Sequence, residues 1–151
     1  MDTPIVSFRD KHAFLSNFTP CYIDIDGHLT LTSVEHEYQA AKALVPRQAQ
    51  AIRECATAGL AKRAGRKCTM RPDWNEIKLD VMLGLLRKKF AIEPFRSMLL
   101  ATGNAALIEG NDWGDKYWGV VRCGAGWEGH NHLGRLLVQV RRELAETNQE
   151  A

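Results

Sequence analysis

The hydrophobic period of the chain changes at Ser33, and this change limits the fold classes open to it. Before Ser33, the stretch "CYIDIDGHLTLTS" alternates around an Asp-Gly pair, a strong local signal for a β-hairpin. From Ser33 onward the spacing of apolar residues is helical, and Ser33 is a suitable N-cap residue. Most of the remaining chain keeps this spacing. We therefore expect an α+β fold: a mostly helical single domain with a small antiparallel β-sheet.

Five helices are expected, the first of them starting at Ser33. The clearest spans residues 71–91, where Asp73 stands as N-cap and Glu76 follows three residues later, the arrangement of a capping box. The stretch 47–67 contains Gly59 and Gly65 as candidate breaks. The expected segments are helices at 33–45, 47–67, 71–91, 93–103 and 131–144, short strands at 4–8 and 105–110, and a loop at 12–20.

The length and charge of the chain favour one ordinary globular domain. A chain of 151 residues can bury a core without disulfides or metal, so we expect one domain over 1–146 and a frayed tail at 147–151. The net charge is +2, and each half of the chain is close to balanced. This balance argues against a dedicated nucleic-acid binder, but it leaves room for a small phosphorylated ligand.

Targeting and cysteine signals point to the cytoplasm. The N-terminal stretch "MDTPIVSFRD" has no apolar region typical of a signal peptide, and no stretch approaches the length of a membrane span. The four cysteines are scattered and form no C-x-x-C pair: Cys21, Cys55, Cys68 and Cys123. We expect reduced thiols, a cytoplasmic location and no membrane partner.

A polar row and an apolar row run side by side along the helix expected from Ser33. Glu35, Gln39 and Lys42 fall within one arc, because four and seven residues nearly complete one and two turns. The neighbouring row is almost wholly apolar: Val34, Tyr38, Ala41 and Val45. From spacing alone, the polar row is either a solvated face or the lining of a pocket.

The stretch 111–129 is rich in aromatic residues and glycine. It interleaves acidic and basic side chains with large rings, and such a segment suits a planar ligand oriented by a carboxylate. Packing in the core is an equal alternative. Further on, "GHNHLG" opens the last helix, where free backbone amides favour an anion. Capping by Asn131 is the simpler interpretation. The interleaved residues are Asp112, Trp113, Asp115, Lys116, Tyr117 and Trp118.

Several common kinds of site are not indicated. His130 and His132 are two residues apart, a spacing that does not place two metal ligands on one helix face, so we expect no metal. There is no nucleophile elbow and no Walker or dinucleotide fingerprint, so we expect no cofactor. A run of basic residues is more often a solvated helix face than a phosphate site. That run is Lys62, Arg63, Arg66, Lys67 and Arg71.

Six motifs, in order over nearly the whole chain, resemble one family. They are "LSNF", "SVEHEYQAAK", "RPDW…K…VM…LL..KF", "LLATGNAALIE", "DKYWG" and "G.N.LGRLLVQVR". As a set they closely resemble the YbiA-like, or NADAR (NAD- and ADP-ribose-associated), family, which implies the YbiA-like fold. The chain departs from the family pattern at Glu37 and in "VRCGAGWEGHNH".

The resemblance implies an N-glycosidase. It points first to early intermediates of riboflavin biosynthesis, from which cleavage would release ribose 5-phosphate and an aminopyrimidine. One alternative is a hydrolase that removes ADP-ribose from modified nucleobases, with ADP-ribosylated nucleic acid as its substrate. Another is a module that binds ADP-ribose or a related nucleotide without cleaving it. In each case the partner is a small phosphorylated ribosyl group.

Cleavage of such a bond creates positive charge at the anomeric carbon, which a carboxylate stabilises while an acid protonates the leaving nitrogen. Through the matching motif, Glu35 is the first candidate and Asp115 the second. Lys42 offers another route, because a free amine can attack C1 of a ring-opened ribosylamine as a Schiff-base nucleophile. The joint presence of Glu35 and Lys42 favours an enzyme, with the polar row lining its pocket. The expected substrate-binding residues are Trp74, Trp113 and Trp118 for stacking, Asn17 and Asn131 for ribose or phosphate, Arg66 and Arg71 for phosphate, and Phe18, Gln39 and Gly119.

Overall fold

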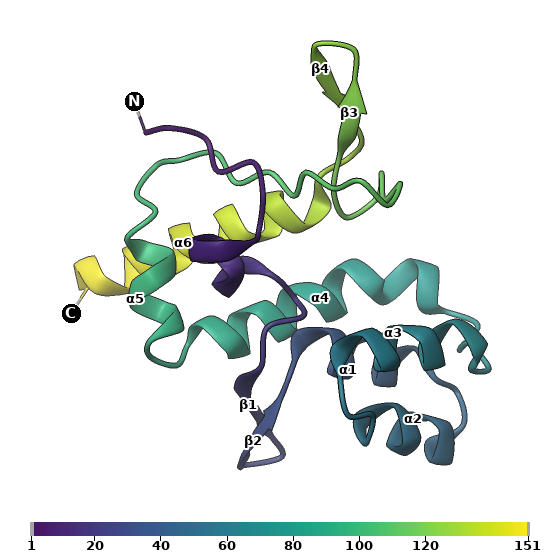
Figure 1. The fold of residues 1–151 in the computed structure, drawn as a ribbon. Coiled ribbons are helices and arrows are strands. Elements are labelled where there is room, and N and C mark those ends of the chain that lie inside the picture. Colours follow the sequence, from purple (N-terminus) through teal and green to yellow (C-terminus); the bar gives the residue numbers. More distant parts are fainter. Residues whose placement is uncertain (1, 151) are drawn as a thin grey trace. The chain divides into compact units, whose positions relative to one another are not determined.

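The computed structural model describes residues 2–150, and about half of these are helical. The chain divides into two compact units. The first unit combines Met1–Ser16 with Glu93–Ala151, and the second is Asn17–Ile92. Each unit is described by itself below. Figure 1 shows the order of the elements along the chain.

The second unit begins with the hairpin predicted from the sequence. Strands β1 (Cys21–Ile25) and β2 (His28–Thr32) pair antiparallel, with Cys21 opposite Thr32 and Ile25 opposite His28. Asp26 and Gly27 form the turn, and both have positive φ angles, of 52° and 83°. Such a turn matches the right-handed twist of the flanking strands, which explains why an Asp-Gly pair stands there. The hairpin prediction is confirmed.

Helix α1 (Val34–Lys42) begins where the sequence predicted it to. The Ser33 hydroxyl accepts the backbone N–H of His36 over 3.0 Å, which is the expected N-cap bond. Helix α1 packs against α2 (Pro46–Arg53), α3 (Ala58–Lys67) and α4 (Trp74–Phe90), as Figure 1 shows. Every residue from 34 to 40 is therefore buried. Both rows are therefore buried over residues 34–40, whereas Ala41, Lys42 and Val45 at their C-terminal ends are half-buried.

The stretch predicted as one helix at 47–67 is two helices, α2 and α3. The break falls at residues 54–57, where the Thr57 hydroxyl accepts the N–H of Leu60 and starts a new helix. Gly59 and Gly65 lie inside α3, so the prediction that they mark breaks is wrong. The capping residue Thr57 therefore decides where the new helix begins, and the two glycines do not interrupt it.

Helix α4 confirms the clearest prediction, but the expected capping box does not form. Asp73 occupies the N-cap position without a side-chain bond to the backbone. Its carboxylate instead accepts two hydrogen bonds from the Arg71 guanidinium, at 2.7 and 3.0 Å. A bidentate pair with arginine is stronger than a neutral cap bond, so the carboxylate turns toward Arg71.

The first unit contains a 3-10 helix η1 (Asp10–Leu15), helices α5 (Phe95–Leu100) and α6 (His132–Glu150), and strands β3 (Val121–Cys123) and β4 (Gly126–Glu128). The strands predicted at 4–8 and 105–110 are reduced to isolated parallel bridges, one between Ile5 and Leu107 and one between Gly110 and Val120. Part of the predicted loop at 12–20 belongs to η1. These segments are too irregular for a continuous ladder.

A second small sheet lies in the aromatic segment, where the sequence predicted no strand. Strands β3 and β4 pair antiparallel around Gly124 and Ala125 and form a hairpin that stands out from the first unit in Figure 1. Gly124 has a φ angle of 58°, which glycine adopts without strain. Residues 2–150 thus form two two-stranded sheets, where the sequence predicted one.

Helix α6 continues further than predicted. The segment expected as a frayed tail, 147–151, is helical as far as Glu150, and Ala151 lies outside the described residues. The Thr147 hydroxyl donates to the carbonyl of Glu143, and Arg96 on α5 donates to the Asn148 side chain over 2.6 Å. These bonds hold the last turn of the helix. No helix within residues 2–150 is long and apolar enough to cross a membrane.

Candidate functional site

Glu35 is a buried carboxylate on the central helix of the second unit. The residue is 7% exposed. Its backbone N–H donates to the carbonyl of Asn17 over 3.0 Å, and its Oε1 accepts a hydrogen bond from Nε2 of Gln39 over 2.9 Å. Gln39 lies one turn further along α1, as the polar row predicted. The structure therefore brings together three of the predicted site residues.

The two residues that bond to Glu35 each carry an amide oxygen that is buried without a hydrogen-bond partner among residues 2–150. They are Oδ1 of Asn17 and Oε1 of Gln39. The Asn17 amide nitrogen makes only a weak contact, 3.6 Å from the Met82 sulfur. Leaving a buried polar atom without a partner costs about 1–3 kcal/mol, so such atoms are rare outside functional sites.

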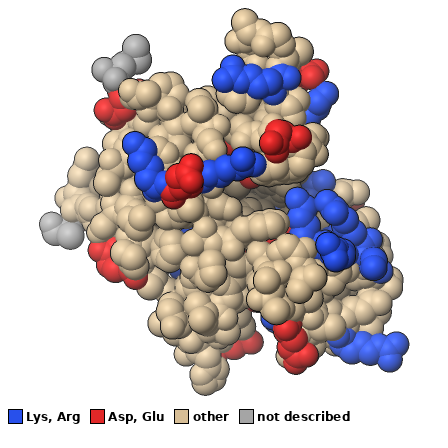
Figure 2. Space-filling model, viewed as in Figure 1, with Lys and Arg blue, Asp and Glu red and all other residues tan. Residues whose placement is uncertain are grey.

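A cationic helix face lies beside this cluster. The Lys62 ammonium on α3 stands 5.7 Å from the centre of the Phe18 ring, and Phe18 is 44% exposed. Figure 2 shows Lys and Arg side chains gathered over α3. Arg66 is exposed there and makes no ion pair within the described part of the chain. The remaining cations of this α3 cluster are Arg63 and Lys67.

Arg71, the other predicted phosphate ligand, already has a carboxylate partner. The two hydrogen bonds to Asp73 raise the pKa of the Arg71 guanidinium and lower the pKa of the Asp73 carboxyl. The backbone N–H of Arg71 donates to the carbonyl of Lys42, the last residue of α1. The Lys42 side chain is half-buried and forms no ion pair among residues 2–150.

Trp74 lies in the core. It is 3% exposed, and its ring packs on that of Tyr38 with 4.9 Å between centroids. This contact gives Trp74 a packing role where α4 begins against α1. Its predicted stacking on a base stays a prediction.

The two other polar residues between Glu35 and Tyr38 are fully engaged. Glu37 accepts hydrogen bonds from Arg53 at 3.0 Å and from the Thr32 hydroxyl at 2.9 Å. The His36 ring contacts the Ser33 hydroxyl and the carbonyl of Cys55. These partners explain how a Glu-His-Glu sequence can be buried. Only the departure from the family pattern at Glu37 pointed to this arrangement in the sequence.

In the first unit, Asp115 organises the "DKYWG" turn. Its Oδ1 accepts the backbone N–H groups of Tyr117 and Trp118, at 3.0 and 2.9 Å. Its own backbone N–H and carbonyl both bond to the buried side chain of Asn111. Asn111 was not predicted, and its amide is the centre of this turn. Asp115 therefore has a structural role that its sequence position alone does not indicate.

The aromatic rings of this segment contact one another and two histidines. The Tyr117 ring meets Trp118 edge-on at 4.9 Å and His132 at 4.5 Å, and His130 stacks on His132 at 5.2 Å. Trp113 is apart from this group: it is 52% exposed, with the Arg9 guanidinium 5.6 Å from its ring.

Gly119 and Asn131 fix the backbone around this turn. A Cβ at residue 119 would overlap the carbonyl of Glu109, so only glycine fits. The Asn131 side chain accepts the N–H of Glu109 and donates to the carbonyl of Leu107, each over 3.0 Å. Asn131 thus ties the start of α6 to residues 107–109, a use of its side chain that the prediction of a cap or a ligand contact did not include.

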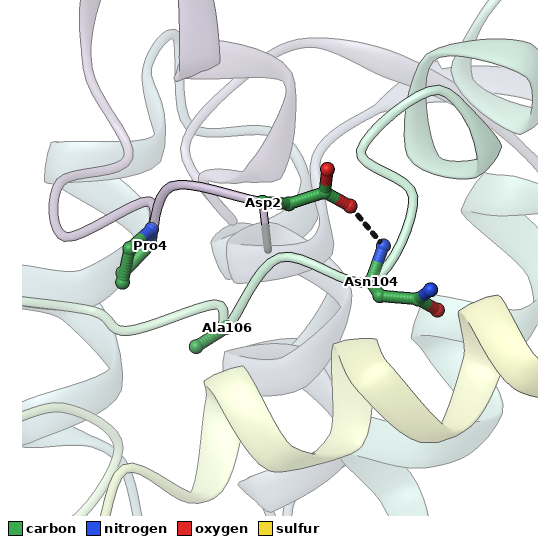
Figure 3. A pocket seen from close by; sticks show the side chains of 4 residues that line it. All are labelled: Asp2, Pro4, Asn104 and Ala106. Carbon is green, nitrogen blue, oxygen red and sulfur yellow. Dashed lines mark hydrogen bonds between the residues drawn. The ribbon is translucent and has the colours of Figure 1, made fainter.

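A separate pocket of the first unit holds none of the predicted site residues. Asp2, Pro4, Asn104 and Ala106 line it, and the Asp2 carboxylate accepts the backbone N–H of Asn104 over 2.7 Å (Figure 3). Across residues 2–150 no three side chains are grouped as a metal site would require.

The NADAR domain profile matches residues 6–145, which include parts of both units. The chain belongs to the NADAR domain family. It is 36% identical to N-glycosidase YbiA of Escherichia coli (strain K12), over 96% of this chain and 91% of that protein. It is 37% identical to riboflavin biosynthesis protein VVA0006 of Vibrio vulnificus (strain YJ016), over 97% of this chain. This NADAR chain spans 40% of the length of the Vibrio protein.

The fold of this NADAR chain is also that of a solved relative. The NMR structure of the E. coli protein YbiA matches it with a TM-score of 0.84 and 35% identity, over 100% of this chain and 90% of that one. The predicted family and fold class are confirmed.

Proposed function

We propose that this protein is an N-glycosidase that cleaves the bond between a phosphorylated ribose and a nitrogenous base-like group. The observation that carries the proposal is the buried Glu35 carboxylate, to which Gln39 donates a hydrogen bond. The backbone N–H of Glu35 also bonds to Asn17, which carries a second buried amide. The names of the relatives support the same reaction, because the E. coli protein is called an N-glycosidase.

The preferred substrate is an early intermediate of riboflavin biosynthesis, with ribose 5-phosphate as one product. The relative from Vibrio vulnificus supports this choice, because it is named a riboflavin biosynthesis protein. The cations of α3 supply a site for the phosphate group, because they lie on the helix that packs on α1. Arg66 is the stronger candidate than Arg71, since Arg71 is bonded to Asp73.

In the direct route, the bond between C1 of ribose and the leaving nitrogen breaks, and its electron pair goes to the nitrogen. Glu35 stabilises the positive charge that develops at C1. A proton passes to the nitrogen and a water supplies hydroxide to C1, so that ribose and a free amine result. Asp115 stays the second candidate for a catalytic carboxylate, although two backbone amides already bond to its Oδ1.

In the alternative route, the Lys42 amine attacks C1 of the ring-opened ribosylamine and displaces the amine. Water then hydrolyses the lysine imine and regenerates the free amine. Lys42→Arg separates the two routes. Loss of turnover with retained substrate binding would support the imine, whereas full activity would remove it.

The test is to incubate the purified protein with the ribosylaminopyrimidine phosphate and to measure released ribose 5-phosphate. Glu35→Ala should abolish release, and Glu76→Ala is the matched control because Glu76 is exposed on α4. Equal activity in native protein and Glu35→Ala would remove Glu35 from the mechanism. An inactive native protein would overturn the riboflavin assignment.

One observation favours ADP-ribose as a second candidate substrate. Helix α3 carries four cations within six residues, and a single phosphate monoester needs fewer. A diphosphate would use more of this charge. Release of ADP-ribose from an ADP-ribosylated nucleobase, in parallel with the first assay, decides between the two. Binding without release would instead indicate a recognition module.

A further inference from the structure

Within residues 2–150 the Gln39 amide makes one side-chain hydrogen bond, and that bond goes to the proposed catalytic carboxylate. Nε2 of Gln39 donates to Oε1 of Glu35 over 2.9 Å, and both residues are 7% exposed. The orientation of the amide is fixed by this bond, because the reversed amide would place its oxygen against the carboxylate oxygen.

The other end of the same amide is enclosed by helix α3. Oε1 of Gln39 is buried and has no hydrogen-bond partner among residues 2–150. Gly65 lies directly against it, and a Cβ at residue 65 would overlap Oε1 and come within 2.6 Å of the amide carbon. The amide is therefore held between the Glu35 carboxylate and the backbone of α3.

This arrangement is poorly explained by packing alone. An apolar side chain of the same length would fill the space without burying an oxygen that lacks a partner. The enclosed oxygen also leaves little room for a substrate group to reach it. What the glutamine adds over an apolar residue is the hydrogen bond to Glu35.

We infer that Gln39 is a positioning residue that orients the Glu35 carboxylate, and that Gly65 is required because only glycine leaves room for the Gln39 amide. The inference rests on the proposed function and deepens it. It replaces the earlier expectation that Gln39 contacts substrate directly. Gln39 on α1 and Gly65 on α3 thus act on the reaction through Glu35.

The first test is Gln39→Met, which keeps the length of the side chain and removes both amide atoms. We expect kcat for ribose 5-phosphate release to fall about 10- to 100-fold, the value of one hydrogen bond to a charged group. KM should change less than about threefold, because the substrate loses no contact. The melting temperature should change little, because removal of the unpartnered Oε1 offsets the loss of the hydrogen bond to the buried Glu35 carboxylate.

The second test is Gly65→Ala, with Gly59→Ala as its matched control on the same helix. A Cβ at residue 59 meets only the Thr57 hydroxyl, at 3.9 Å. Gly59→Ala should keep native kcat. Gly65→Ala pushes the Gln39 amide out of place without removing any polar group from the protein, so kcat should fall as in Gln39→Met. If Gly65→Ala does not fold, Gln39→Met still decides the question.

Two results would overturn the inference alone. One is native kcat in Gln39→Met when Glu35→Ala is inactive. The other is a raised KM with unchanged kcat, which would make Gln39 a substrate contact. Full activity in Glu35→Ala would overturn the proposed role of Glu35 instead, so the two failures are distinguishable.

Discussion

The Arg53 guanidinium on α2 donates to the Glu37 carboxylate on α1 over 3.0 Å, and Glu37 lies two residues from Glu35 on the same helix. The Glu37 side chain is 6% exposed, whereas that of Arg53 is 42% exposed. The bond joins two helices of the second unit. The charge of the Glu37 carboxylate is therefore balanced by an arginine within the protein. The Glu35 carboxylate instead accepts its hydrogen bond from the neutral amide of Gln39.

Removal of Arg53 should destabilise the protein without stopping catalysis. In Arg53→Met the buried Glu37 loses its charged partner, and we expect the free energy of unfolding to fall by about 1–3 kcal/mol. Urea denaturation at pH 7 measures this change. Arg47→Met, at an exposed position of α2, is the control and should be near neutral. A kcat below one tenth of native in folded Arg53→Met would contradict a purely structural role.

The secondary structure was readable from sequence where local chemistry decides it. The Asp-Gly turn, the Ser33 cap and helix α4 all follow from residues close together in the chain. The split between α2 and α3 was not predicted, because glycine suggests a helix break at 59 and 65, whereas the break is set by the Thr57 hydroxyl, which caps α3. The prediction of short strands at 4–8 and 105–110 was wrong, because the pairing of these two segments joins residues about one hundred positions apart in the chain.

The candidate site was readable only in part, for a related reason. The row of Glu35 and Gln39 follows from helical spacing, and the structure joins the two by a hydrogen bond. Gly65, which encloses the Gln39 amide, is distant from it in sequence and leaves no periodic signal. Arg71 is bonded to Asp73 only two residues away, but helical spacing does not predict that pair either. Sequence spacing thus located the side chains without showing what each one contacts.

Variants of Asp115 should separate a structural carboxylate from a proton donor. Asp115→Asn keeps an oxygen that can accept the N–H groups of Tyr117 and Trp118, but it cannot donate a carboxyl proton. If Asp115 only holds the turn, Asp115→Asn should keep at least a third of native kcat. If it is the proton donor, kcat should fall about 100-fold or more.

Asp115→Ala removes the acceptor as well, so it should lower the free energy of unfolding by about 1–2 kcal/mol. Thermal unfolding measures this effect. Asp112→Ala is the control in the same segment, because the Asp112 side chain is 83% exposed and makes only a 3.6 Å contact to Arg9. Equal melting temperatures for Asp115→Ala and Asp112→Ala would contradict the structural role.

Arg66 and Arg71 should differ in their effect on substrate binding. Arg66 is exposed and makes no ion pair within residues 2–150, whereas Arg71 is bonded twice to Asp73. We expect Arg66→Met to raise KM for a phosphorylated substrate by about 3- to 30-fold, the range of a charge-assisted phosphate contact. Arg71→Met should raise KM less. Steady-state kinetics at fixed salt measures both, and a larger effect at Arg71 would reverse the assignment.

Lys89 should make the stability of the protein depend on pH in the alkaline range. It is fully buried in α4, and burial lowers its pKa from 10.5 to about 8. Between these values the unfolded chain binds the proton and the folded chain does not, so the free energy of unfolding rises with pH. The shift corresponds to about 3 kcal/mol, gained between pH 8 and 10.5. Burial raises the pKa of the Cys21 thiol, so above pH 9 this group lowers the free energy of unfolding as pH rises.

The effect of Lys89 is therefore isolated by comparing native protein with Lys89→Met, by urea denaturation at pH 7.5 and pH 10. The stability difference, native minus variant, should increase with pH, whereas a constant difference would show that Lys89 titrates alike in both states.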